Sequence, residues 1–242
     1  MHDNHRDRSS RTRPSPGVGR RGNAPAKSER LVPRLRGVSH AIAFFVAVGA
    51  TSVLIVLAPA GRARLAVAVY GAGLIALFGG SALYHRWPGP IRFKPLLRRV
   101  DHSTIFVFIA ASYTPLALMV LHGPLVWVML TVSWIGAAAG VAFSLGWIEA
   151  PRAVVAGSYL ALGWLAVIAI PQLLGELAPA PLILFGTGGL LYTVGALVYT
   201  MRRPDPWPRT FGFHEIFHAL VIAAAAAHYV AVIGWVLPAA RA

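Results

Sequence analysis

The sequence contains no cysteine among its 242 residues. The chain therefore cannot form a disulfide, present a thiolate nucleophile or bind a metal through sulfur, and a metal site would have to use His, Asp or Glu. Charged residues are also scarce, at 12% of the chain, which is about half the usual fraction in a soluble domain. Apolar residues make up 57% and fall in long uninterrupted runs. This composition indicates a lipid bilayer as the solvent.

Acidic residues are few, with eight Asp and Glu against 22 Lys and Arg and a formal net charge of +14. Such a charge can indicate nucleic-acid binding. However, ten of the basic residues precede Val38, and most of the others lie in two loops between apolar runs. Basic loops beside apolar segments are typical of membrane proteins, where they face the anionic cytoplasmic leaflet. We therefore expect membrane lipid as the partner and no nucleic acid.

Residues 1–37 are rich in Arg, Ser, Pro and Gly and show no apolar periodicity. Such a segment cannot bury enough apolar surface to offset the entropy lost on ordering. We predict a disordered basic tail over residues 1–37, followed by a transmembrane domain over residues 38–242. A secretory signal is not expected, because the basic stretch is too long and the next apolar run is long enough to span the membrane and stay there.

Seven apolar runs follow the tail, each near the ~20 residues that a helix needs to cross about 30 Å of hydrocarbon. Backbone exposed to lipid must form its hydrogen bonds within its own segment, so each run predicts a transmembrane helix. The predicted helices cover residues 38–58, 65–85, 100–121, 125–145, 153–170, 182–201 and 213–237. The predicted fold is an all-α membrane protein, a seven-transmembrane helix bundle.

The orientation of the bundle follows from its basic residues. With the N-terminus in the cytoplasm, the cytoplasmic segments hold nineteen Lys and Arg and the outer segments hold three. Because cytoplasmic loops of membrane proteins carry an excess of positive charge, we predict a cytoplasmic N-terminus and a C-terminus outside the cell.

This topology brings ionisable residues from three helices to the cytoplasmic edge. Ser81 and His85 end the second helix, Asp101 begins the third, and His214 and His218 begin the seventh. Residues 214 and 218 are one helical turn apart, so both imidazoles can reach one ion. With His85 they supply three nitrogen ligands and leave a fourth position for water, which is the catalytic form of zinc coordination. Asp101 would hold or deprotonate that water, and Ser81 could hydrogen-bond the water or a substrate carbonyl.

Other interpretations of these residues are simpler. Asp101 alone could cap the N-terminus of its helix, but burying several ionisable groups in a bilayer is costly without a partner. We interpret His40, His102 and His122 as interfacial residues. His228 lies roughly 15 Å deeper than the cluster along its helix, and we interpret it as a packing or hydrogen-bonding residue.

Residues 214–218 read His-Glu-Ile-Phe-His and match the HExxH pattern of zinc peptidases, in which the glutamate is the general base. An intramembrane metalloprotease with Glu215 as its base is therefore a rival hypothesis. It leaves Ser81, His85 and Asp101 unexplained. Elsewhere, residues 136–140 form a small-xxx-small pattern for close helix packing, within the bundle or between protomers.

Four segments carry a family resemblance: Ser-Ala-Leu-Tyr-His at 81–85, Asp-His-Ser-Thr-Ile-Phe at 101–106, Ala-Ser-Tyr-Thr-Pro at 111–115 and the motif at 214–218. In their order and helix placement they resemble the hemolysin III family of bacterial membrane proteins. This family is related to the progestin and adipoQ receptors and, more distantly, to the alkaline ceramidases. The resemblance implies a seven-helix bundle in the bacterial cell membrane with zinc on its cytoplasmic side. Its ligands would be His85, His214 and His218, with Asp101 and Ser81 as polar companions.

Our leading hypothesis from the sequence is a zinc-dependent hydrolase of a lipid amide or ester. Asp101 would act as the base, and Ser81 would help to stabilise the oxyanion. A non-enzymatic protein, either a receptor-like sensor or a pore-forming cytolytic protein with a structural metal, is the alternative from another class. The metalloprotease is the third hypothesis.

Overall fold

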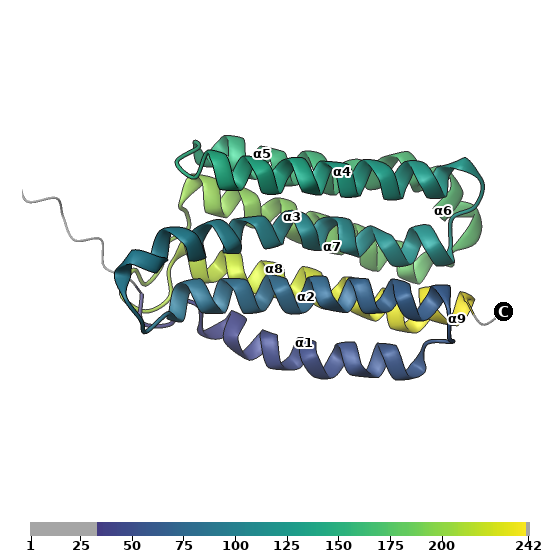
Figure 1. The fold of residues 1–242 in the computed structure, drawn as a ribbon, viewed down its shortest axis with the longest axis horizontal. Helices are drawn as coiled ribbons and strands as arrows, with labels where there is room; N and C mark the ends of the chain where they lie inside the picture. The colour runs from purple at the N-terminus through teal and green to yellow at the C-terminus, as the bar shows by residue number, and fades with distance from the viewer. Residues whose placement is uncertain (1–32, 241–242) are drawn as a thin grey trace, which may run out of the picture. The chain divides into compact units, whose positions relative to one another are not determined.

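The computed structural model describes residues 33–240, and seven helices in this part of the chain are long and apolar enough to cross a membrane. Their number and order confirm the predicted fold (Figure 1). Three spans combine more than one helical element. The elements are α1 (Val38–Leu57), α2 (Arg62–Arg86), η1 (Ile91–Phe93), α3 (Lys94–Met119), α4 (Pro124–Gly146), α5 (Arg152–Gly163), η2 (Trp164–Ala169), α6 (Ile170–Glu176), α7 (Pro179–Met201), α8 (Phe213–Ala231), η3 (Val232–Val236) and α9 (Leu237–Ala239).

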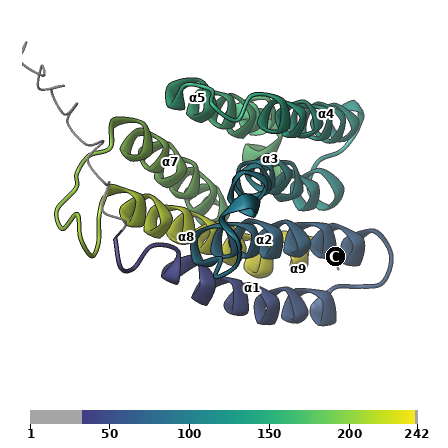
Figure 2. The same ribbon diagram turned by 60° about the vertical axis from the view of Figure 1, so that its left-hand side comes forward.

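The helix contacts close a ring around the interior of the bundle. The ring runs from α1 through α2, α3, α5, α7 and α8 and returns to α1, while α4 packs on α3 and α5. Figure 2 shows α3 between α2 and the pair formed by α4 and α5. Because the polypeptide passes back and forth, the starts of α1, α3, α5 and α8 meet the ends of α2, α4 and α7 at one end of the bundle.

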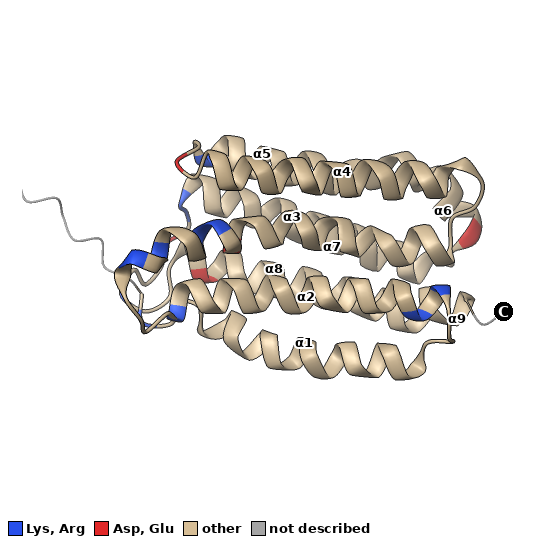
Figure 3. Ribbon diagram, in the orientation of Figure 1, with Lys and Arg blue, Asp and Glu red and all other residues tan. Residues whose placement is uncertain are grey.

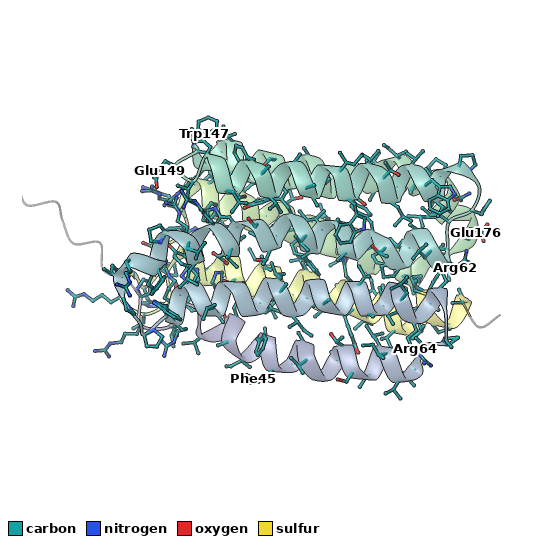
Figure 4. The ribbon with its side chains drawn as sticks, viewed as in Figure 1. Phe45, Arg62, Arg64, Trp147, Glu149 and Glu176 are labelled. Atoms are coloured by element: carbon teal, nitrogen blue, oxygen red, sulfur yellow. The ribbon has the colours of Figure 1, made fainter. Side chains whose placement is uncertain are left out.

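Basic residues gather at this shared end (Figure 3). We call it the basic end; it holds Arg36, Arg86, Arg98, Arg152 and Arg202. The opposite end, called the far end, carries Arg62 and Arg64, which are labelled in Figure 4. This separation matches the charge count in the sequence. That the basic end faces the cytoplasm stays a prediction.

The third span begins earlier than predicted, at Ile91 rather than residue 100. Its first turns contain Arg92, Lys94 and Arg98. We had taken each span from a run of apolar residues, and these charged residues fell outside that run. Pro95 lies in the first turn of α3, where a missing N–H costs no hydrogen bond and the fixed φ suits a helix. Long basic side chains can also extend along the helix toward water while their stems lie in an apolar environment.

Prolines shape the fifth and seventh spans. We predicted that the fifth helix ends at residue 170, but the span continues to Glu176 because Pro171 lies in the first turn of α6, after the 3₁₀ segment η2. In the seventh span, the π-helical turn η3 ends at Val236, two residues before Pro238. A proline ring clashes with the carbonyl four residues before it, and a wider turn relieves that clash.

Residues 33–37, which we assigned to the tail, form a turn that leads into α1. The backbone N–H groups of Arg34 and Leu35 donate to the carbonyls of Arg209 and Thr210, at 3.1 and 3.3 Å. This pairing holds the turn to the loop before α8. The remainder of the predicted disordered tail lies outside the described residues.

The small residues of α4 are used within the bundle. A Cβ atom added at Gly140 would lie 2.2 Å from the ring of Phe106 in α3, and one added at Gly136 would lie 2.6 Å from Leu162 in α5. Small residues let neighbouring helices approach closely. Of the two uses we considered for this pattern, the structure shows packing inside the chain.

Candidate metal centre

Helices α2 and α8 bring three histidines together at the basic end. One ring nitrogen from each of His85, His214 and His218 lies within 4.8 Å of the other two. The Nε2 atoms of His85 and His214 are 3.0 Å apart. His214 and His218 lie on successive turns of α8, whereas His85 reaches them from the last turn of α2. The structure therefore brings together the three residues that we proposed as ligands.

The burial of these rings fits a bound cation. His218 is 2% exposed, and its Nδ1 has no hydrogen-bond partner within residues 33–240. The side chain of His85 is 7% exposed. Buried polar atoms without partners are costly, and a divalent ion bound by the three rings would offset this cost for His218. Imidazole nitrogens suit zinc, and three of them leave one of its four positions open.

Asp101 and Ser81 lie next to the histidines. Asp101 Oδ2 is 4.0 Å from His85 Nε2, and the Ser81 hydroxyl hydrogen-bonds the Asp101 carboxylate. Both residues are buried. Because α3 starts at Lys94, Asp101 lies about two turns inside the helix. The alternative in which Asp101 caps the helix is therefore wrong.

A cavity of about 440 Å³ extends into the bundle from His214 and His218, which line it. It lies among α3, α5, α7 and α8, with Asp101 and His214 at the basic end and Leu173 toward the far end. Aliphatic and aromatic side chains form most of its wall. The cavity can therefore receive an apolar chain and place a polar group of the same molecule beside the histidines.

Glu215, the base in the metalloprotease hypothesis, is engaged elsewhere. Its Oε1 accepts a hydrogen bond from Arg36 Nε at 2.5 Å, and its Oε2 accepts one from the Gly212 backbone N–H at 2.8 Å. The residue is 2% exposed. With both oxygens occupied, Glu215 holds the start of α8, and this geometry does not favour a role as general base.

His40 and His122, which we interpreted as interfacial, differ in their environments. The ring of His40 stacks on that of His218, with centroids 3.7 Å apart and planes 9° apart, and His40 is 3% exposed. Our interfacial interpretation is wrong for His40, because the packing of α1 on α8 places it inside. His122 lies at the far end with its side chain 65% exposed, 3.6 Å from Glu176, as expected of an interfacial residue.

His102 and His228, the other two histidines outside the cluster, line the cavity. His228 Nε2 is 3.3 Å from the Phe185 carbonyl oxygen, which confirms its hydrogen-bonding role. The carbonyl of His102 accepts a hydrogen bond from the Tyr159 hydroxyl at 3.2 Å. Arg36 and His40 are the site neighbours that sequence reasoning missed. Arg36 fell within the predicted tail, and His40 is a single histidine in an apolar run.

The fold and the site define a class: a multi-pass integral membrane protein whose seven spanning helices, all within residues 33–240, surround an apolar cavity with a histidine cluster at one end. Residues 29–229 match the family model described as "Haemolysin-III related". The chain belongs to this family.

Three relatives extend the comparison. The chain is 32% identical over 208 residues to Hemolysin-3 of Bacillus cereus, covering 84% of this chain and 91% of the relative. It is 32% identical to the Hemolysin-3 homolog of Bacillus subtilis (strain 168), with coverage of 68% and 74%. It is also 32% identical to the human monocyte to macrophage differentiation factor, with coverage of 68% and 67%. The bacterial relatives and the seven spans indicate a protein of the cell membrane.

Proposed function

We propose that the chain is a metal-dependent hydrolase that cleaves an amide or ester bond of a membrane lipid. The observation that carries this proposal is the position of the histidine cluster, with a buried carboxylate beside it, at one end of an apolar cavity that His214 and His218 line. A lipid can enter such a cavity with its acyl chain and present its carbonyl to the cluster. His85, His214 and His218 would hold the metal, for which zinc is the best match to three imidazoles.

The chain's own residues supply the proton transfers. Bound zinc would contribute Lewis-acid chemistry, polarising a carbonyl and acidifying water. Asp101 would accept the proton of the attacking water and return it to the leaving amine or alkoxide. Ser81 orients the carboxylate through their hydrogen bond. The apolar wall holds the acyl chain and excludes bulk water, which strengthens electrostatic interactions at the reacting atoms.

The test compares wild type, Asp101→Asn and Glu149→Gln, purified as full chains in detergent. Glu149 is a matched control, because it lies at the same end but is 78% exposed and pairs with Arg98 on the surface. Fatty-acid release from ceramide-like and ester lipids is measured together with bound metal. We expect Asp101→Asn to lose about 10²–10⁴-fold in turnover at unchanged metal content, and Glu149→Gln to match wild type. Metal-loaded wild type without turnover on any lipid would contradict the hydrolase.

A cytolytic function is the second candidate, because two bacterial relatives are named for hemolysis. Dye-loaded lipid vesicles distinguish the two functions. A hydrolase releases fatty acid from the vesicle lipid without early leakage, and Asp101→Asn abolishes that release. A cytolytic protein causes leakage that Asp101→Asn retains.

A further inference from the structure

The first residues of α1 and the turn before it contact His85, His218 and the residue that follows His214. Arg36 pairs with Glu215, which follows His214 directly in α8. This ion pair is held on both sides, because Glu215 also binds the Gly212 N–H and the turn around Arg34 pairs with the loop before α8. The start of α8, where His214 lies, is thereby fastened to the chain that enters α1.

Gly37 lies against the ligand from α2. A Cβ atom at this position would lie 2.5 Å from His85 Cβ, closer than carbon atoms can approach. Its φ of +76° also falls in the left-handed region, which favours glycine. The backbone of Gly37 therefore forms a wall that limits where the side chain of His85 can go.

His40 covers the third ligand. Its ring lies nearly parallel to that of His218, with centroids 3.7 Å apart. The contact is thus one of ring faces. It restricts rotation of His218, because the stacked ring occupies the space into which His218 would turn.

We infer that residues 36–40 are a positioning segment that holds the three histidines at the separation a metal ion requires. The ligands come from two helices, α2 and α8, and α1 packs against both. One segment at the start of α1 can therefore set the distance between them. Groups that orient metal ligands typically change metal affinity by 10–100-fold when they are altered. This inference rests on the proposed metal site and adds to it the residues that shape it.

Two glycine variants test the segment, with Co²⁺ as the probe. Gly37→Ala places a methyl group against His85. Gly123→Ala is the matched control, since Gly123 also has a positive φ of +64° but no atom within 4 Å of an added Cβ. Its ψ of −153° places it in a region essentially restricted to glycine. Backbone strain alone would therefore harm Gly123→Ala at least as much as Gly37→Ala.

Full-length protein in detergent is titrated with Co²⁺, and its d–d absorption reports ligand geometry. We expect Gly37→Ala to bind Co²⁺ about 10–100-fold more weakly, with an altered spectrum, and Gly123→Ala to stay within about twofold of wild type. Equal affinity in Gly37→Ala and wild type, or an equal loss in Gly123→Ala, would overturn the positioning role and leave the metal site standing. Wild type that binds no Co²⁺ would overturn both.

A second pair of variants decides the matter if Gly37→Ala does not fold. His40→Phe keeps a flat ring against His218, whereas His40→Ala removes the ring. We expect His40→Ala to weaken Co²⁺ binding about tenfold or more and His40→Phe to restore the wild-type affinity and spectrum. Wild-type affinity in His40→Ala would contradict the inference.

Discussion

At the scale of single residues, His218 is the ligand with the least freedom, since it is buried and stacked on His40. Replacing it with alanine should abolish stabilisation by metal. A ligand at a hundred times its Kd stabilises the folded state by about 2.7 kcal/mol. We therefore expect zinc to raise the Tm of wild type and of His122→Ala, and not that of His218→Ala. The comparison is made by thermal unfolding in detergent with zinc or chelator, and a zinc shift retained in His218→Ala would contradict its role as a ligand.

Substituting Glu215 distinguishes a structural role of this residue from a catalytic one. Breaking a fully buried ion pair costs 3–5 kcal/mol, but Arg36 is 21% exposed, so we expect Glu215→Gln to lower stability by about 1–3 kcal/mol. At saturating zinc its turnover should stay within about tenfold of wild type, because a general base contributes 10²–10⁴-fold. Turnover and thermal unfolding are measured on the same preparation. A loss of 10²-fold or more with metal bound would restore Glu215 as the base.

Some residues of the candidate site could be predicted from the sequence and others could not, for physical reasons. His214 and His218 could be paired because a helix places residues four apart on one face. His85 and Asp101 joined them only after the direction of each span was known. His40 stayed hidden, because its contact with His218 depends on which helices pack together, and neither charge nor periodicity encodes that.

At the scale of helices, close packing of α3 on α4 depends on Gly140. Alanine there would place its methyl group 2.2 Å from the Phe106 ring, and such overpacking typically costs 1–3 kcal/mol. Gly157 of α5 has no atom within 4 Å of an added Cβ, so alanine there should stabilise by about 0.5–1 kcal/mol through helix propensity. Thermal unfolding should therefore show opposite shifts for Gly140→Ala and Gly157→Ala. Equal shifts would contradict this packing.

The number and order of the spans were predictable, because each apolar run has the length that the bilayer demands. Their ends were less predictable. Pro171 and Pro238 lie inside spans, since a helix can restart at a proline or widen before it. The first turns of α3 contain basic residues, so the helix begins before the apolar run does. Hydropathy alone therefore placed the middle of each span and missed several ends.

At the scale of the whole molecule, the closed ring of helices produces the cavity, and no single segment of sequence describes it. The cavity has polar groups at the basic end and apolar walls beyond them. Which leaflet a lipid substrate leaves thus depends on which side of the membrane the basic end faces. The charge distribution predicts that the basic end faces the cytoplasm.

The absence of cysteine makes this prediction directly testable, because a single introduced thiol will be the only one in the chain. Glu149 and Glu176 are exposed acidic residues at opposite ends of the bundle, the basic end and the far end (Figure 4). With the basic end in the cytoplasm, a membrane-impermeant maleimide should label Glu176→Cys in intact cells and Glu149→Cys only after permeabilisation. The reverse pattern would place the histidine cluster at the outer face. Lipids of the outer leaflet would then be the substrates to test, because the polar end of the cavity would lie on that side.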